Sequence, residues 1–370
     1  MKVLYVNAGA EEGGGKTHIL SLLLQFPAKE VEMAVFEEGS IAREARESGM
    51  PVHLFAQTSR YDISVLPRLA RFINERGFDI IHTHGARANF FLSLIKDRIH
   101  AKWVTTVHSD PLLDFMECGV RGWLFTRLHL RSFRKVDLFF AITEQFKENL
   151  LRLGVPAEKI RTVYNGIEYD QQPAAPYSRL NLGIEAGAFT LIQVARLHPV
   201  KRHEILFEAL QKAGIPNVKV LLVGDGTAEQ HLKQEVSKRG LSSVVSFLGY
   251  RKDVKRLYAS ADLSLLTSQS ESFPLVLLES ANQRVPFIAT NVGDMHKLIP
   301  DPSYGWIVPI DDADALAEAL CQAYSKWQRG ELKEMGQRIH EYASRRFSLR
   351  KLYEDTHQAY RQLLQHAVRV

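Results

Sequence analysis

The chain has 370 residues, of which 45% are hydrophobic and 24% charged, and 47 Lys and Arg against 42 Asp and Glu give a formal net charge of +5. At roughly 100–200 residues per domain this length suggests two domains, and the even charge balance excludes a disordered acidic or basic chain. The longest apolar runs, such as VKVLLVG at 218–224, are far shorter than the ~20 residues that span a bilayer.

The N-terminus, MKVLYVNAGAEE, turns acidic before a signal-peptide core is complete. We therefore expect it to form a first β-strand in a cytoplasmic protein. The two cysteines, Cys118 and Cys321, lie in unrelated segments without metal-binding spacing. They are predicted to be buried thiols rather than a disulfide or a zinc site.

Short aliphatic or β-branched runs alternate with segments of helical periodicity, which is typical of βα units around a parallel sheet. In the first half, strands are predicted at 2–7, 31–36, 79–84, 102–108, 138–143 and 161–166. Helices are predicted between them at 17–26, 40–49, 64–76, 86–96, 121–135 and 144–153. In the second half, strands are predicted at 189–195, 218–224, 245–249, 263–267, 286–290 and 305–309, and helical stretches at 334–347 and 348–368 end the chain.

The segment DQQPAAPYSRL (170–180) carries two prolines and no periodicity, so we interpret it as a linker. It places a domain boundary between 1–170 and 171–347. Ligands of open α/β sheets bind beyond the carboxyl ends of the strands. We therefore expect the functional site to lie between the two domains.

A glycine-rich turn, AGAEEGGGKTHIL (8–20), follows the first strand. It resembles a P-loop only in part, because Ala10 stands where that pattern needs its first glycine. A nucleotide hydrolase is therefore disfavoured. Two interpretations stay open: backbone N–H groups that approach an anion, or a tight turn and nothing more.

Two further segments carry charges where strands are predicted to end. Arg196 and Lys201, in VARLHPVKR, could clamp a diphosphate, the arginine as a planar fork and the lysine as a point charge. In SESFPLVLLES, Glu271 precedes a helix that Ser272 could cap and whose first turn suits Pro274. Glu279, eight residues after Glu271, could face the same side. Capping and solvation alone would also explain these charges.

Taken together in chain order, these and other segments make the sequence resemble glycosyltransferase family 4, the retaining nucleotide-sugar transferases of the GT-B fold. The segments are GGGKTH (13–18), DIIHTHG (79–85), TTVHSD (105–110), EKIRTVYNGIE (158–168), VARLHPVKR (194–202), LLVGDG (221–226), FLGYRKDVKRLYASADL (247–263), ESFPLVLLES (271–280) and FSLRKLYEDTHQAY (347–360). The resemblance implies an α/β protein of two Rossmann-like α/β/α domains. Residues 1–170 would bind the acceptor and 171–347 the nucleotide-sugar donor, and a C-terminal helix at 348–370 would cross back to the first domain.

The resemblance also assigns roles to residues of this chain. Arg196 and Lys201 match the pair that holds the donor diphosphate, Glu271 matches the glutamate near the reacting sugar, and His108 matches a histidine beside the anomeric region. These are the predicted catalytic residues. The predicted donor-binding residues are Gly13, Gly14, Gly15, Arg196, Lys201, Gly224, Tyr250, Arg251, Glu271, Ser272, Phe273, Pro274, Leu275 and Glu279.

Within that set, Glu279 would bind the ribose hydroxyls, and Tyr250 and Arg251 would pack the nucleobase. The amides around Phe273 to Leu275 would line the sugar and phosphate pocket, although Pro274 has no N–H to give. No bound cofactor and no essential metal are expected, because Asp311, Asp312 and Asp314 are interpreted as helix caps and dipole partners.

The basic segment RGWLFTRLHLRSFRK (121–135) could pack its apolar side on the sheet or lie on an anionic membrane. The sequence thus predicts a cytoplasmic enzyme, with a place at the inner face of the membrane left open. We expect it to transfer a hexose from a nucleotide diphosphate sugar, with UDP favoured, to a glycan or lipid-linked hydroxyl acceptor, and to bind no nucleic acid. The alternatives are a sugar-nucleotide epimerase of the same fold and a non-catalytic nucleotide or glycan binder.

Overall fold

The computed structural model describes residues 1–11, 14–60, 62–108 and 119–367 of the chain. Its contacts divide the chain into two compact units. Unit 1 comprises Met1–Gly166 with Leu349–Val370, and unit 2 comprises Ile167–Ser348. These divisions lie beside the predicted boundaries at 170/171 and 347/348.

Unit 1 is built on a parallel sheet in the order β3-β2-β1-β4-β5-β6-β7. The strands are β1 (Val3–Asn7), β2 (Val31–Val35), β3 (Val52–Leu54), β4 (Ile80–His84), β5 (Lys102–Val107), β6 (Leu138–Ala141) and β7 (Ile160–Thr162). The inner strands are buried on both faces, which explains why they read as nearly continuous apolar runs.

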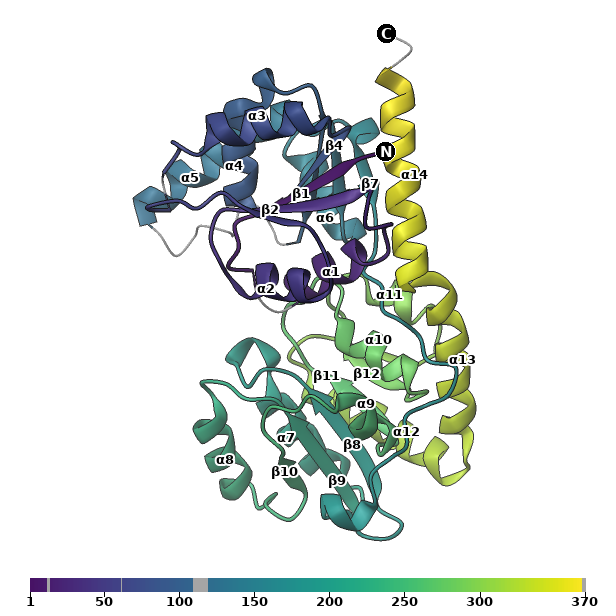
Figure 1. The fold of residues 1–370 in the computed structure, drawn as a ribbon. Coiled ribbons are helices and arrows are strands. Elements are labelled where there is room, and N and C mark those ends of the chain that lie inside the picture. Colours follow the sequence, from purple (N-terminus) through teal and green to yellow (C-terminus); the bar gives the residue numbers. More distant parts are fainter. Residues whose placement is uncertain (12–13, 61, 109–118, 368–370) are drawn as a thin grey trace. The chain divides into compact units, whose positions relative to one another are not determined.

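Helices cover both faces of this sheet (Figure 1). They are α1 (Gly14–Leu23), α2 (Ser40–Glu47), α3 (Leu66–Arg76), α4 (Ala86–Ile95), α5 (Gly119–Ser132), α6 (Glu144–Arg152) and α14 (Leu349–Ala367). One core joins Leu4 and Val6 to side chains of α3 and α4. The other joins Val3 and Tyr5 to side chains of α1, α2 and α14. The sheet therefore separates two apolar layers.

The C-terminal helix α14 is an integral part of unit 1, as the sequence predicts. Its Tyr360 is fully buried, and the hydroxyl lies 3.1 Å from that of Tyr5 in β1 and 2.5 Å from Nδ1 of His82 in β4. Phe26 packs edge-on against Tyr353 of the same helix. Residues from the end of the chain thus complete a core that its first strand begins.

Unit 2 repeats the architecture with a six-stranded parallel sheet in the order β10-β9-β8-β11-β12-β13. Its strands are β8 (Phe189–Val194), β9 (Val218–Val223), β10 (Val245–Phe247), β11 (Leu263–Leu266), β12 (Phe287–Thr290) and β13 (Trp306–Val308). Its helices are α7 (His203–Ala213), α8 (Glu229–Lys238), α9 (Val254–Ala259), α10 (Leu275–Asn282), α11 (Met295–Leu298), α12 (Ala313–Gln328) and α13 (Glu331–Arg346). The carboxyl group of Asp312 caps α12 by accepting a hydrogen bond from the Ala315 amide at 2.8 Å, as predicted.

Several local predictions were wrong. The strand β3 was missed, because three residues at the sheet edge carry too little periodicity to detect. The first helix begins at Gly14, earlier than the predicted residue 17. Cys321 is exposed, because it lies on the outer face of α12, whereas Leu316, Leu320 and Ala323 lie on the buried face. Cys118 lies outside the described residues.

Candidate active site

In unit 2, the sheet order reverses direction between β8 and β11. The chain leaves β8 toward β9 on one side, whereas β11 continues toward β12 on the other. At such a switch point the loops diverge and leave a crevice at the carboxyl ends of the strands, where α/β sheets bind ligands. Arg196 and Lys201 follow β8, and Glu271 follows β11. The predicted charges therefore come from the two loops that flank this point.

Lys201 and Glu271 form a direct ion pair. Nζ of Lys201 donates to Oε1 of Glu271, and both side chains are mostly buried, with exposed fractions of 16% and 15%. The hydroxyl of Ser268 donates to the same oxygen at 2.7 Å. Hydrogen bonds to charged partners are stronger than neutral ones, so this contact fixes Glu271 in one orientation.

The backbone around this pair is also tied together. The hydroxyl of Thr267 donates to the Lys201 carbonyl at 2.7 Å, and the Gln269 amide donates to the Val200 carbonyl at 2.8 Å. Arg196, in contrast, is exposed. The loops after β8 and β11 thus form one connected surface that offers Lys201 and Glu271 as a pair and Arg196 as an accessible cation.

Helix α10 starts differently from its sequence-based prediction. It begins at Leu275 with Pro274 in the N-cap position, and no side chain caps it, so the predicted role of Ser272 as a cap is wrong. The extended φ and ψ of Pro274 place it just before the helix rather than in its first turn. The ring of Phe273 is buried against Phe347, 4.9 Å between ring centroids. The start of α10 is therefore anchored by packing.

Close backbone packing supports the same region. Gly293 has φ of 53°, and a methyl group there would lie 2.0 Å from the Ser272 carbonyl oxygen. Gly224 has φ of 138°, and a methyl group there would lie 2.0 Å from the Ala195 carbonyl oxygen. Both glycines are required because neighbouring loops touch their backbone. This packing explains Gly224 without a ligand, and its donor-binding role stays a prediction.

Glu279, on α10, has an environment unlike that of Glu271. Burial raises the pKa of Glu279 to about 7, and the positive charge of Lys255 opposes this shift. Burial raises the pKa of Tyr258 well above its usual value, with a further contribution from the charge of Glu279. The Tyr258 hydroxyl donates to the Val276 carbonyl at 2.8 Å. Glu279 is therefore a carboxyl group that titrates near neutral pH.

Tyr250 and Arg251 differ in how firmly they are held. Tyr250 is 65% exposed. Arg251 makes a two-pronged ion pair with Asp253, from Nε at 2.7 Å and from Nη2 at 2.5 Å. This contact lowers the pKa of Asp253 and raises that of Arg251. The Tyr177 hydroxyl donates to the same carboxylate, so Arg251 is oriented before any ligand arrives.

In unit 1, the sheet reverses direction between β1 and β4. Gly14 and Gly15 open α1 after β1, and Gly13 lies outside the described residues. A methyl group at Gly15 would lie 2.5 Å from Oε1 of Glu11. Nδ2 of Asn7 donates to the other oxygen of Glu11 at 3.4 Å. The start of α1 therefore already has a carboxylate beside it, a residue that sequence reasoning missed.

His108 follows β5 and contacts two further histidines. Its Nε2 lies 2.9 Å from Nδ1 of His84, and its ring meets that of His18 edge-on with centroids 5.0 Å apart. Burial lowers the pKa of His84 and His108 well below the usual histidine value, and that of His18 to about 4. All three are thus neutral at pH 7. The sequence pattern indicates His108, but it assigns no separate role to His18 or His84.

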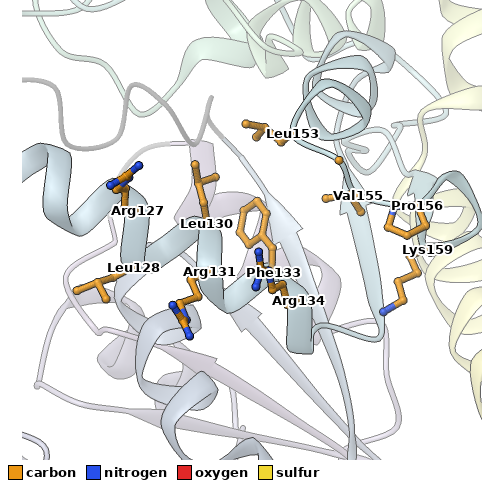
Figure 2. Close-up of a pocket in the computed structure, with 11 residues that line it drawn as sticks. Arg127, Leu128, Leu130, Arg131, Phe133, Arg134, Leu153, Val155, Pro156 and Lys159 are labelled. Atoms are coloured by element: carbon orange, nitrogen blue, oxygen red, sulfur yellow. The ribbon is translucent and has the colours of Figure 1, made fainter.

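A separate cavity of about 830 Å³ lies in unit 1, between the end of α5 and the loop after α6 (Figure 2). It is lined by Arg127, Leu128, Leu130, Arg131, Phe133, Arg134, Leu153, Gly154, Val155, Pro156 and Lys159. It lies where β6 and β7 begin, whereas His84 and His108 lie where β4 and β5 end. In a parallel sheet the starts and the ends of the strands lie on opposite sides. The cavity is therefore distinct from the histidine cluster.

The three aspartates before α12 are engaged with protein groups. Asp311 pairs with Arg202 at 2.9 Å, Asp312 caps the helix, and Asp314 pairs with Lys212 at 2.8 Å. In the described part of the chain, no three His, Cys, Asp or Glu side chains are arranged to hold a metal ion. There, too, no helix is both long and apolar enough to cross a membrane.

Two family models match the chain in succession. Glycosyltransferase Family 4 matches residues 12–171, and Glycosyl transferases group 1 matches residues 178–346. The chain belongs to glycosyltransferase family 4. The two matches adjoin near the division between unit 1 and unit 2. This family 4 protein is a glycosyltransferase of the kind that builds polysaccharides or other glycoconjugates.

Characterised relatives share the sequence over most of its length. The chain is 29% identical to N-acetyl-alpha-D-glucosaminyl L-malate synthase of Bacillus anthracis over 310 residues, 79% of this chain and 77% of that protein. It is 27% identical to D-inositol 3-phosphate glycosyltransferase of Saccharomonospora viridis, covering 78% of this chain and 70% of that protein.

Solved structures share the fold. The crystal structure of Anabaena HepE in complex with UDP superimposes with a TM-score of 0.86 at 21% identity, covering 98% of this chain and 100% of that one. A sucrose-phosphate synthase from Thermosynechococcus elongatus superimposes with a TM-score of 0.76 at 20% identity, covering 99% and 100%. Family 4 membership and these neighbours confirm the predicted GT-B fold.

Proposed function

We propose that this glycosyltransferase moves a hexose from a UDP-sugar to a hydroxyl acceptor with retention of the anomeric configuration. The observation that carries the proposal is the Lys201–Glu271 pair, held by Ser268 at the switch point of the unit 2 sheet. A cation for a departing diphosphate and a carboxylate beside it are the two charges such a transfer needs. Fixed charges of this kind are usually the largest contribution to catalysis.

The site supplies a separate group for each part of the donor. Arg196 and Lys201 would neutralise the diphosphate as it leaves, and Glu271 would contact the transferred sugar. Glu279 would accept hydrogen bonds from the ribose hydroxyls. The nucleobase would pack against the exposed ring of Tyr250, beside the oriented Arg251. UDP as the nucleotide is supported by HepE, whose solved complexes contain UDP and UDP-glucose.

We propose further that transfer needs no divalent cation. The carboxylates of the only D-x-D sequence, Asp312 and Asp314, already cap a helix and pair with Lys212. Arg196 and Lys201 would carry the charge that a metal ion supplies elsewhere. Transfer that persists unchanged in excess EDTA supports this, and activity that vanishes with EDTA and returns with Mg²⁺ or Mn²⁺ contradicts it.

The test of the donor site begins with thermal shifts of the full chain against nucleotides and nucleotide sugars. A ligand that binds the native state stabilises it by RT ln(1 + [L]/Kd), so UDP and one UDP-sugar should raise the melting temperature. Lys201→Ala and Arg196→Ala should lower kcat/KM with that sugar by at least about 100-fold. Lys212→Ala, whose partners Glu208 and Asp314 lie outside the site, is the matched control.

Product analysis separates this proposal from its alternatives. NMR of the product should show the anomeric configuration of the donor. Incubation with the UDP-sugar alone should leave it intact or slowly hydrolysed. Conversion of the sugar to an epimer without an acceptor would identify the epimerase instead, and UDP binding without any turnover would identify a non-catalytic binder.

We also propose that the basic cavity of unit 1 contacts an anionic membrane surface, which would bring the enzyme to a lipid-linked acceptor at the inner face of the membrane. Every ionisable residue that lines the cavity is basic, and Arg131 and Arg134 are exposed. Figure 2 shows Leu130 and Phe133 beside these arginines on one side and Val155 and Pro156 on the other. Apolar and basic side chains together fit the boundary between headgroups and acyl chains.

Vesicle sedimentation tests this contact. The full chain should bind vesicles that contain anionic phosphatidylglycerol, and binding should weaken with salt. At about 1 kcal/mol per basic residue near an anionic surface, Arg131→Glu with Arg134→Glu should lower the affinity at least tenfold. Lys333→Glu with Arg345→Glu, two exposed positions on α13, is the matched control. Equal loss in both double variants would indicate a general charge effect and contradict the proposal.

A further inference from the structure

The pair His84–His108 contains one hydrogen bond whose direction the surrounding atoms decide. His84 ends β4 and His108 follows β5, and the two strands are paired so that His84 lies opposite Thr106. Nδ1 of His84 lies 2.9 Å from Nε2 of His108, with the rings stacked and tilted by 29°. The rings are close because His84 ends one buried strand and His108 follows the adjacent one.

Both imidazoles of the pair are neutral. Burial lowers the pKa of His84 and of His108, and the neighbouring His18 lowers both further. A neutral imidazole has one N–H and one lone pair. The bond between Nδ1 of His84 and Nε2 of His108 therefore requires that one ring donates and the other accepts, which leaves two arrangements.

The second nitrogen of His84 separates these arrangements. Nε2 of His84 is buried and forms no hydrogen bond with any described residue. If His108 donated, the single proton of His84 would sit on this nitrogen as a buried N–H without an acceptor. Orphaned buried N–H groups are rarer in proteins than under-satisfied acceptors. The proton of His84 therefore belongs on Nδ1, from which it is donated to His108.

We propose that His84 is a positioning residue that fixes His108 in the tautomer with its proton on Nδ1. Nε2 of His108 is occupied as the acceptor from His84, so the partly exposed His108 presents an N–H donor to a ligand. It therefore cannot remove a proton from the acceptor through that nitrogen. A neutral donor suits a sugar hydroxyl or a phosphate oxygen, the groups that the proposed function brings to this residue.

The tautomer can be measured without any activity assay. Full-length protein labelled with ¹⁵N-histidine is studied at pH 7.5 by long-range ¹H–¹⁵N correlation, and His108→Gln assigns the signals. We expect a pyrrole-type Nδ1 and a pyridine-type Nε2 for His108. The reverse pattern, with the proton on Nε2, would overturn the proposal in the wild-type protein alone, whether or not His108 matters for transfer.

Variants at position 84 test the positioning role. His84→Asn keeps an N–H donor near Nδ1, whereas His84→Ala removes it. We expect His84→Ala to give mixed tautomer signals for His108 and to lower kcat on the order of 10- to 100-fold, with a smaller change in donor KM, and His84→Asn to restore most of both. His129→Gln, another buried histidine of unit 1, which bonds to Asn89, is the control.

The outcomes separate this proposal from the proposed function, on which its kinetic part rests. If the wild-type spectrum shows the expected tautomer but His108→Gln leaves kcat unchanged, the tautomer is confirmed and His108 has no role in transfer. An unchanged His108 tautomer in His84→Ala would show that His84 does not set it and would overturn the positioning role.

Discussion

At the scale of single residues, the two glutamates of unit 2 show how environment divides similar groups. Glu271 has a cation and a hydroxyl within bonding distance. Burial dominates at Glu279, whose pKa rises to about 7. The sequence could predict both positions from a recognised motif. It could not predict their different surroundings, because Lys201 reaches Glu271, and Lys255 and Tyr258 reach Glu279, through the fold rather than through neighbouring sequence.

The raised pKa of Glu279 predicts a pH dependence of UDP binding. A carboxylate accepts hydrogen bonds from two hydroxyls, and protonation removes part of this capacity. UDP affinity should therefore fall as the pH drops through 7, by up to about tenfold per pH unit. Isothermal titration calorimetry between pH 6 and 8.5 checks this.

The control for that titration is Glu279→Gln, because the terminal phosphate of UDP also titrates near pH 6. The variant should bind UDP more weakly at pH 8 and should lose the extra pH dependence. Since the folded pKa of Glu279 lies above its unfolded value, its ionisation lowers the stability as the pH rises from about 4.5 to about 7, and the full loss is present at pH 8. Glu279→Gln should therefore raise the melting temperature of the free protein at pH 8. If UDP affinity changed with pH in the variant as steeply as in the wild type, Glu279 would not be the group that titrates.

The Lys201–Glu271 pair predicts opposite effects on binding and turnover. In the free protein the carboxylate of Glu271 neutralises Lys201 and would repel a diphosphate. Glu271→Gln removes this charge, so UDP should bind a few-fold more tightly while kcat falls at least about 100-fold. Calorimetry and initial rates measure the two effects. A parallel loss of UDP affinity and turnover would indicate that Glu271 instead holds the loop in shape.

At the scale of elements, periodicity predicted most strands and helices of the described chain, because apolar runs flanked by turn residues mark buried parallel strands. The errors occur where an element is very short or where tertiary packing sets the residue at which a helix begins. The three-residue β3 has no detectable pattern, and α10 starts at Leu275 because Phe273 packs on Phe347 and Gly293 contacts the Ser272 backbone. The histidine contacts among β4, β5 and α1 likewise require tertiary packing, which spacing in the sequence does not encode.

The buried histidines of unit 1 predict that this unit is sensitive to acid. Burial lowers the pKa of His18, His82, His84, His108 and His129. Below pH 6.5 the unfolded chain binds protons that the folded unit does not, so the free energy of unfolding decreases as the pH is lowered. Each such histidine contributes up to about 1.4 kcal/mol per pH unit.

Hydrogen exchange at pH 7.5, 6.5 and 5.5 measures this difference. Protection of the slowest amides in β4 and β5 should decrease more steeply toward acid than that of β8 and β9. Unit 2 is the internal reference, because its most strongly buried histidine is His203, whose pKa is lowered to about 4, whereas unit 1 has five buried histidines with lowered pKa values. Equal slopes in both units would show that these histidines of unit 1 do not stay neutral in the folded state.

At the scale of the whole molecule, the chain builds the same parallel architecture twice and returns its last helix to the first sheet. The sequence predicted this arrangement only through its resemblance to family 4, since helical periodicity at 348–368 does not say which sheet the helix covers. The decisive contacts are polar and specific. Tyr360 bonds to Tyr5 and His82, which lie more than 270 residues away in sequence.

Tyr360 predicts that the two units respond differently to a change near the C-terminus. Tyr360→Phe leaves the Tyr5 hydroxyl and Nδ1 of His82 without this partner and should cost unit 1 about 1–3 kcal/mol. Tyr360→Ala also leaves a cavity among buried side chains and should cost about 3–5 kcal/mol. Hydrogen exchange should show lost protection in β1 and β4 with β8 and β9 unchanged, because unit 2 has its own core. If both sheets lost protection equally, the units would unfold as one cooperative body, and the terminal helix would stabilise the whole molecule rather than the sheet on which it packs.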